Sequence, residues 1–323
     1  MHALIVADIE GSWNVYNLTD EEQERNKDSV TKEVEVCILA LQENGITDIT
    51  VCDSHDRGDS VCSKMLNSRN VVRVSQLTTL ITHQQMKYDF VILLGYHGKN
   101  NSGGILEHTL RPDVRKVWLQ NEVEIGEVEL LCRWFGHYKI PVILVIGDVE
   151  AVREGNYFNP YRYGCSVKGS PYANSAKNAK LLYSKIAKSV EMALTVEFWA
   201  CIAHDNDPVY IEFEGYEENI STLNQRQYIG ERTLRYDNCH SLMLDMGCFV
   251  EKLNGFLYQN QKANAKFVKE MRDMTKIVSR EMVTDTNILT LMSKDSTWLN
   301  AADRKKISSY FLGLKEQIEG DME

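Results

Sequence analysis

Residues 90–97 read Phe-Val-Ile-Leu-Leu-Gly-Tyr-His, an uninterrupted apolar run that ends in glycine, tyrosine and histidine. Residues 3–7 and 141–146 are short apolar runs of the same character, and residues 46–52 read as a further strand. Strands that are apolar on both faces are typical of parallel sheets covered by helices on each side. Residues 30–41 read as such a helix, because their apolar side chains recur at helical spacing, and so do residues 125–138. The sequence therefore predicts an α/β fold with a mostly parallel sheet and flanking helices.

The first predicted helix has recognisable ends. Asp28 or Ser29 can cap its amino terminus, and Gly45 can end it. We expect a helix that begins near Asp28 and ends before the strand at residues 46–52.

The character of the sequence changes near residue 150. An aromatic, turn-rich connection at residues 157–164 precedes a helix expected over about residues 174–194. Apolar and polar side chains then alternate in residues 209–214, which is the mark of a half-buried strand. These patterns predict three parts: an α/β domain at residues 1–165, a smaller α+β domain at 166–240 and a helical C-terminal extension at 241–323.

The predicted C-terminal extension carries two amphipathic stripes: Phe267, Met271, Met274 and Val278, and then Ile307, Phe311 and Leu314. An apolar stripe on a helix must be covered by something. Either the extension packs back on its own chain, or it covers a neighbouring subunit.

Composition and charge argue against several classes of protein. The 323 residues include 36 basic and 46 acidic side chains, a formal net charge of -10, which argues against binding to nucleic acid. No apolar run approaches the roughly 18–20 residues that span a bilayer, and the amino terminus lacks the features of a signal peptide. The eight cysteines are scattered without a CxxC pair, as expected of reduced thiols. We expect a cytoplasmic protein with no membrane or nucleic-acid partner.

Acidic and imidazole side chains follow the apolar strands at equivalent places. Asp8 and Glu10 come directly after the first strand, His55 follows the second and His97 the third, while Glu127 stands at a helix start. In open parallel sheets, ligands bind outside the carboxyl ends of the strands. We therefore expect these side chains to converge in one crevice of the domain at residues 1–165.

Two histidines and three carboxylates suit Zn²⁺ or a similar first-row metal. Five ligands are more than one catalytic zinc ion needs, and a bridging carboxylate would let them hold two ions about 3.5–4 Å apart. Each residue alone has a more ordinary role, as a turn or helix cap, a structural histidine or a partner of the helix dipole. Their occurrence together at equivalent places favours a metal site.

Two further residues have candidate roles. His108 follows the glycine-rich stretch Gly103-Gly104, whose backbone can approach a ligand closely. It can serve as a general acid or base, as a donor to a developing oxyanion, or as an ordinary loop histidine. Lys168 is either a binding group for a substrate carboxylate or a solvated lysine.

Six motifs in order resemble the D-aminopeptidase family of dinuclear zinc peptidases. They are Asp8-Ile9-Glu10-Gly11, Asp53-Ser54-His55, Gly95-Tyr96-His97, Glu107-His108-Thr109, Gly126-Glu127 and the apolar strand that ends in Gly147-Asp148. Thr31-Lys32-Glu33-Val34 and Glu43-Asn44-Gly45-Ile46-Thr47 are similar to the family's first helix and its exit. The match covers roughly residues 1–200, and the order of the motifs carries it.

The resemblance implies specific roles for the residues in these motifs. His108 would be the catalytic histidine. The ligands of two zinc ions per chain would be Asp8, Glu10, His55, His97 and Glu127. The resemblance also implies a homo-oligomer, in the family a ring-built decamer that encloses the active sites.

The sequence departs from the family pattern in two places. After Gly11, where the family has a small loop, it continues with Ser12-Trp13-Asn14-Val15. After Lys168, where the family has an arginine, it continues with Gly169-Ser170-Pro171-Tyr172-Ala173-Asn174. The resemblance to the family therefore supports metal chemistry more strongly than it supports a particular substrate.

We expect a zinc-dependent hydrolase that cleaves an amide or peptide bond of a small peptide-like substrate with metal-activated water. Two alternatives stay open. Trp13 and the unfamiliar second domain motivate a related metal-dependent amidohydrolase of a biosynthetic pathway, without specificity for D-peptides. The other alternative is a catalytically silent metal-binding assembly protein.

Overall fold

The computed structural model describes residues 1–55, 58, 60–62, 66, 71–74, 88–111, 114–169, 179–213, 227–230 and 232–245. All of these residues belong to one compact unit, residues 1–269. The predicted extension at residues 241–323 lies outside the described residues, apart from 241–245. The predicted domain boundaries at residues 165 and 240 stay predictions.

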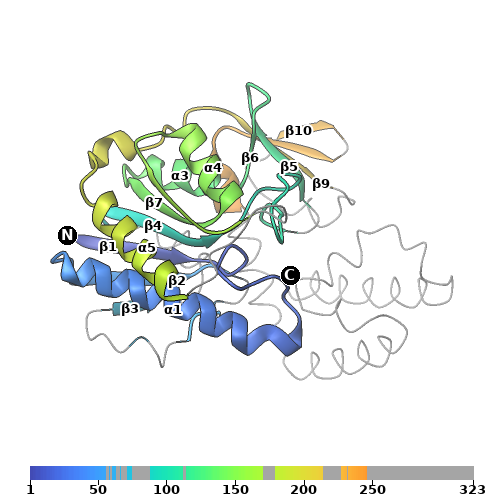
Figure 1. Cartoon of the computed structure of the whole chain (residues 1–323). Helices are drawn as coiled ribbons and strands as arrows, with labels where there is room; N and C mark the ends of the chain where they lie inside the picture. Colours follow the sequence, from blue (N-terminus) through green and yellow to red (C-terminus); the bar gives the residue numbers. More distant parts are fainter. Residues whose placement is uncertain are drawn as a thin grey trace, which may run out of the picture. The chain divides into compact units, whose positions relative to one another are not determined.

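A six-stranded parallel sheet forms the centre of this unit (Figure 1). The strands lie in the order β3-β2-β1-β4-β7-β8, which places the first strand of the chain in the middle of the sheet. Their bounds are β1 His2–Ala7, β2 Asp48–Asp53, β3 Val71–Val74, β4 Phe90–Tyr96, β7 Val142–Asp148 and β8 Tyr163–Lys168. Every residue of β4 and β7 is buried, so the prediction of a parallel sheet with strands apolar on both faces is confirmed.

Helices cover both faces of this sheet (Figure 1). One face packs against α1 (Gln23–Glu43) and α5 (Ala179–Ala193), and the other packs against α3 (Glu127–His137) and α4 (Val149–Phe158). Successive strand residues point to opposite faces, so β1 contributes Ala3 and Ile5 to the first core and Leu4 and Val6 to the second.

A second sheet of five antiparallel strands extends the core on the side of α3. Its strand order is β10-β11-β9-β5-β6, with bounds β5 Val114–Leu119, β6 Glu124–Ile125, β9 Val209–Phe213, β10 Gln227–Gly230 and β11 Thr233–Tyr236. Val117, Ile211 and Leu234 point into the core that contains Trp134 of α3. A smaller antiparallel part therefore accompanies the parallel sheet, and its strands come from residues 114–125 and 209–236. Among the described residues, no helix is long and apolar enough to cross a membrane.

Some expected element bounds differ from the structure. Helix α1 begins at Gln23, so Asp28 and Ser29 lie inside it and the prediction that one of them caps the helix is wrong. The Ser29 hydroxyl instead donates a hydrogen bond to the carbonyl of Trp13. The expected C-terminal end of this helix is confirmed, because α1 ends at Glu43 and Gly45 follows with a φ of 82°.

Candidate metal centre

The segment after β1 brings two carboxylates to the carboxyl edge of the sheet. Asp8 and Glu10 are 5% and 3% exposed. Gly11 holds the segment against β4, because its N–H donates to the Gly95 carbonyl at 2.7 Å and a Cβ at this position would lie 1.6 Å from the Tyr96 carbonyl oxygen. Only glycine allows this approach, so the backbone itself aims both carboxylates.

His55 reaches these carboxylates from the end of β2. Its Nδ1 lies 3.0 Å from Glu10 Oε1 and 3.3 Å from Asp8 Oδ1. The carboxylate of Asp53 closes the loop that follows the strand, because it accepts hydrogen bonds from the backbone N–H of His55 at 3.3 Å and of Val61 at 2.7 Å.

His97 and Glu127 complete the cluster from β4 and α3. His97 is 1% exposed, and its Nδ1–H donates to the Gly98 carbonyl at 2.9 Å. That bond leaves Nε2 facing Glu127 Oε1 at 3.4 Å and Asp8 Oδ2 at 3.7 Å. Glu127 is the first residue of α3, and its Oε1 also accepts from the Leu110 N–H at 2.8 Å.

His108 stacks on His97, with ring centroids 4.1 Å apart and an interplanar angle of 13°. Its Nδ1–H donates to the Leu106 carbonyl at 3.0 Å, so Nε2 points to the cluster, 3.8 Å from Glu127 Oε1. The preceding loop is closed by Glu107, whose carboxylate accepts from the N–H of Gly104 at 2.9 Å. His108 is 28% exposed, so a substrate can reach it.

The electrostatics show a cluster that is short of positive charge. Burial, reinforced by the Glu10 charge, raises the pKa of Asp8 to about 8. Burial alone would lower the pKa of His97, but the carboxylate of Glu127, with smaller effects of Glu10 and Asp8, raises it to about 10. The pKa of His55 is likewise held well above its usual value, mainly by Glu10 and against the effect of burial. The negative charge of the buried carboxylates thus favours bound protons on the neighbouring side chains. A bound metal ion would supply the same positive charge.

These residues fit a metal ion. Within the described part of the chain, Glu10 Oε2 and His97 Nε2 are buried and have no hydrogen-bond partner. Ligand atoms of Asp8, Glu10 and His97 lie within 4.8 Å of one another, and so do those of His97, His108 and Glu127. Imidazole nitrogens and carboxylate oxygens are the donors that zinc takes. All six predicted site residues therefore come together at one place, while the role of each stays a prediction.

Comparison with known proteins places the chain in a family. A family model described as D-aminopeptidase matches residues 1–240. The chain belongs to the D-aminopeptidase family. The family resemblance predicted from the six motifs is confirmed.

This D-aminopeptidase family member is similar to a Bacillus subtilis D-aminopeptidase in sequence and to a solved Bacillus subtilis structure in fold. The D-aminopeptidase of Bacillus subtilis strain 168 is 25% identical over 201 residues, which cover 60% of this chain and 72% of that protein. A solved structure, the Zn-dependent D-aminopeptidase DppA from Bacillus subtilis, described as a self-compartmentalizing protease, has a TM-score of 0.66 at 20% identity. The similarity covers 77% of this chain and 95% of that one, and it shows that the two share a fold.

Lys168 has a position that the sequence did not reveal. It is fully buried, and its ammonium group donates hydrogen bonds to the backbone carbonyls of Glu10 and Val15. It is therefore neither a solvated lysine nor free to bind a substrate carboxylate. Glu33, in the middle of α1, is also fully buried, and its Oε1 accepts from the Trp13 N–H at 2.7 Å. Both side chains contact the segment that follows Asp8, which no local sequence pattern indicates.

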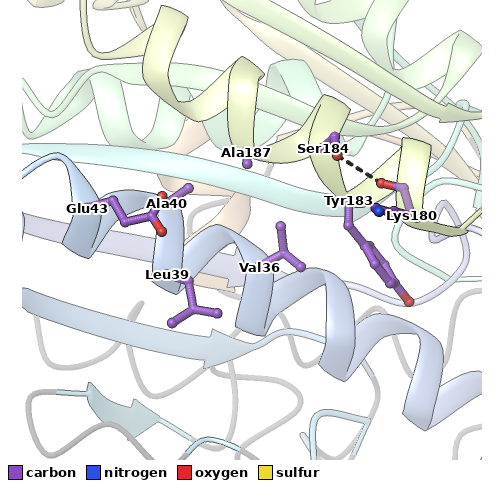
Figure 2. A pocket seen from close by; sticks show the side chains of 8 residues that line it. All are labelled: Val36, Leu39, Ala40, Glu43, Lys180, Tyr183, Ser184 and Ala187. Atoms are coloured by element: carbon purple, nitrogen blue, oxygen red, sulfur yellow. Dashed lines mark hydrogen bonds between the residues drawn. The ribbon is translucent and has the colours of Figure 1, made fainter.

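A groove on the surface lies elsewhere. Figure 2 shows it between α1 and α5, lined by Val36, Leu39, Ala40, Glu43, Lys180, Tyr183, Ser184 and Ala187. It is formed by two helices rather than by strand ends, and it contains none of the predicted site residues. The groove is therefore separate from the candidate metal centre at the carboxyl edge of the parallel sheet.

Proposed function

We propose that this chain is a zinc-dependent aminopeptidase that hydrolyses an amide or peptide bond next to the free amine of a small peptide-like substrate, with D-amino acids as the expected class. Membership of the D-aminopeptidase family supports the reaction. The single observation that carries the assignment to a metal enzyme is the convergence of imidazole and carboxylate groups from three strand ends and one helix start, with Glu10 Oε2 and His97 Nε2 buried and without a hydrogen-bond partner.

The proposed ligands of two zinc ions are Asp8, Glu10, His55, His97 and Glu127. When bound, the ions would lower the pKa of water at the site and offer positive charge to the scissile carbonyl oxygen. The chain's own residues set the ligand geometry: the Gly98 carbonyl fixes the tautomer of His97 so that Nε2 faces the carboxylates. The Leu110 N–H holds one oxygen of Glu127 in the same way.

His108 is the proposed catalytic histidine. The Leu106 carbonyl retains the proton on Nδ1, so Nε2 is the atom that exchanges a proton with the reacting groups. In this role Nε2 protonates the leaving amine or donates to the oxyanion of the tetrahedral intermediate. Glu127 Oε1 lies 3.8 Å from this nitrogen. The same geometry also permits His108 to be a ligand, since it forms one group with His97 and Glu127.

We also propose a homo-oligomer, built as a ring-based decamer that encloses its active sites, in a cytoplasmic setting. The description of DppA as self-compartmentalizing supports assembly. The seven cysteines that the structure describes are free, and six of them are buried, which is compatible with a reducing compartment. The three predicted parts, residues 1–165, 166–240 and 241–323, remain part of this proposal.

One observation favours a second candidate function. Trp13 lies on the segment that follows Glu10, is partly exposed and packs against the core on the side of α1 and α5. A large aromatic side chain at this place would change the shape of the substrate pocket. A metal-dependent amidohydrolase of a biosynthetic pathway, with a substrate other than a D-peptide, is therefore the alternative.

A substrate panel tests the proposal. Purified chain is assayed on matched D- and L-aminoacyl amides and dipeptides, before and after removal of metal by a chelator and after addition of zinc. Hydrolysis of D-aminoacyl substrates that disappears with the chelator and returns with zinc supports the aminopeptidase. Zinc-dependent hydrolysis confined to other amides supports the amidohydrolase. Zinc uptake without hydrolysis of any substrate favours the third possibility, a metal-binding assembly protein.

A further inference from the structure

Residues 10–15 connect the first strand to the rest of the chain, and their backbone is held from two sides by buried side chains. The carbonyls of Glu10 and Val15, at the two ends of the segment, both accept hydrogen bonds from Lys168 at the end of β8. In the middle of the segment, the Trp13 N–H donates to Glu33 of α1. Three backbone groups of this short segment are thus hydrogen-bonded to side chains, two of them to Lys168 of β8 and one to Glu33 of α1.

Burial of both groups is costly. Lys168 and Glu33 are each 0% exposed, and moving an ammonium or a carboxylate out of water costs several kcal/mol per ion. Apolar side chains of similar volume at such positions often give an equally stable or more stable fold. Stability alone therefore does not account for the two groups.

The geometry of the segment does account for them. Glu10 supplies both a proposed ligand side chain and the carbonyl that Lys168 holds, so the ammonium fixes the backbone from which the carboxylate projects. We propose that Lys168 and Glu33 are positioning residues for the metal site: they clamp residues 10–15 and keep the Glu10 carboxylate aimed at the ligand cluster. The clamp acts through Glu10 and touches neither substrate nor metal. This inference rests on the proposed zinc site.

Replacement of Lys168 distinguishes two possible roles of its ammonium group, because they predict opposite changes in zinc affinity. Lys168→Met keeps the length of the side chain but removes the ammonium. If the ammonium acted only as a nearby positive charge, its removal would strengthen the binding of a cation. If it positions Glu10, its removal weakens zinc binding by roughly 10–100-fold, the usual effect of losing a group that orients a ligand.

Glu33 offers a matched pair of variants. Glu33→Leu removes the acceptor of the Trp13 N–H, whereas Glu33→Gln retains an oxygen that can accept it. The clamp predicts weakened zinc binding in Glu33→Leu and near-normal binding in Glu33→Gln. Asp205→Leu is the control for loss of a buried carboxyl, because Asp205 accepts from the N–H groups of Cys239 and His240 and lies away from the ligands.

The experiment measures zinc dissociation constants by competition with a chelator for the full-length chain and these variants, with circular dichroism as the check of folding. Weaker binding in Lys168→Met and Glu33→Leu, with the wild-type value in Glu33→Gln and Asp205→Leu, supports the clamp. Unchanged or tighter binding in Lys168→Met overturns it while the zinc site stands. If Lys168→Met does not fold, equal affinities of Glu33→Leu and Glu33→Gln overturn it. A wild-type chain that takes up no zinc overturns both the clamp and the proposed function.

Discussion

Glu154 on α4 is a buried carboxyl whose replacement by glutamine should remove a pH-dependent loss of stability. Its Oε1 accepts hydrogen bonds from the N–H groups of Gly126 at 2.8 Å and Glu129 at 3.0 Å, at the amino end of α3. Its Oε2 is buried without a hydrogen-bond partner. Burial, against the opposing effect of the two backbone hydrogen bonds, raises the pKa of Glu154 from 4.5 to about 7.

The magnitude follows from the difference between the two pKa values, about 2.5 pH units, which corresponds to about 3 kcal/mol. Between these values the folded chain retains a proton that the unfolded chain has lost. The stabilising contribution is therefore fully present below pH 4.5 and is lost as the pH rises through about 7. Glu154→Gln has no titrating group, so between about pH 5 and 8.5 its free energy of unfolding should rise by about 2–3 kcal/mol relative to wild type.

The assay is urea denaturation of metal-free wild type and variant, followed by circular dichroism at closely spaced pH values. The other titrating groups are common to both proteins, so their effects cancel in the difference except for the groups that interact with Glu154, chiefly Glu129. Glu150→Gln is the control, because Glu150 lies on the same helix and pairs with the exposed Arg153. Curves for Glu154→Gln and wild type that stay parallel over the whole range would refute the reasoning.

Three further predictions concern the site and the assembly. His108→Ala should keep near-normal zinc content and lose roughly 10²–10⁴-fold in turnover; loss of zinc in this variant would instead identify His108 as a ligand. Gly11→Ala should abolish zinc binding, because its Cβ would lie 1.6 Å from the Tyr96 carbonyl oxygen, whereas Gly45→Ala, with no atom within 4 Å of its Cβ, should cost only about 1–2 kcal/mol of stability. If residues 255–323 cover a neighbouring subunit and narrow access to the metal site, their deletion should give a folded species with fewer subunits in solution that accepts longer peptides; light scattering that shows the full number of subunits would exclude this subunit-bridging role.

The parallel sheet could be predicted because its buried strands are recognisable as sequence. The apolar run at residues 90–94 lies in β4, and the run at residues 141–146 corresponds to β7, every residue of which is buried. The sequence does not predict helix α4 or strand β8, and it indicates a turn-rich connection at residues 157–164 where α4 ends and β8 begins. Strand β8 lies at the edge of the sheet and contains Gly164 and Ser166 instead of a continuous apolar run. Its pairing with β7 is a tertiary effect that local patterns do not encode.

The sequence predicts which residues form the candidate site, but it does not predict which buried side chains hold them in place. Asp8 and His97 follow apolar strands, so the topology of a parallel sheet brings them to one edge without any knowledge of contacts. Glu33 lies in the predicted helix at residues 30–41, but its partner is the distant Trp13 N–H. Lys168 donates to the carbonyls of Glu10 and Val15, which are also far from it in the sequence. Side chains such as Glu33 and Lys168, which hold the backbone of a proposed ligand, come from distant parts of the sequence. Local sequence patterns therefore do not indicate them.

Anomalous diffraction at the zinc absorption edge, from crystals of the full-length chain grown with zinc, is the most direct measurement of the proposed metal centre. We expect two peaks about 3.5–4 Å apart, each within bonding distance of side chains from the set Asp8, Glu10, His55, His97 and Glu127. His108 should lie close to both peaks without binding either one. A single peak outside this set, or no peak at the carboxyl edge of the parallel sheet, would contradict a dinuclear zinc enzyme.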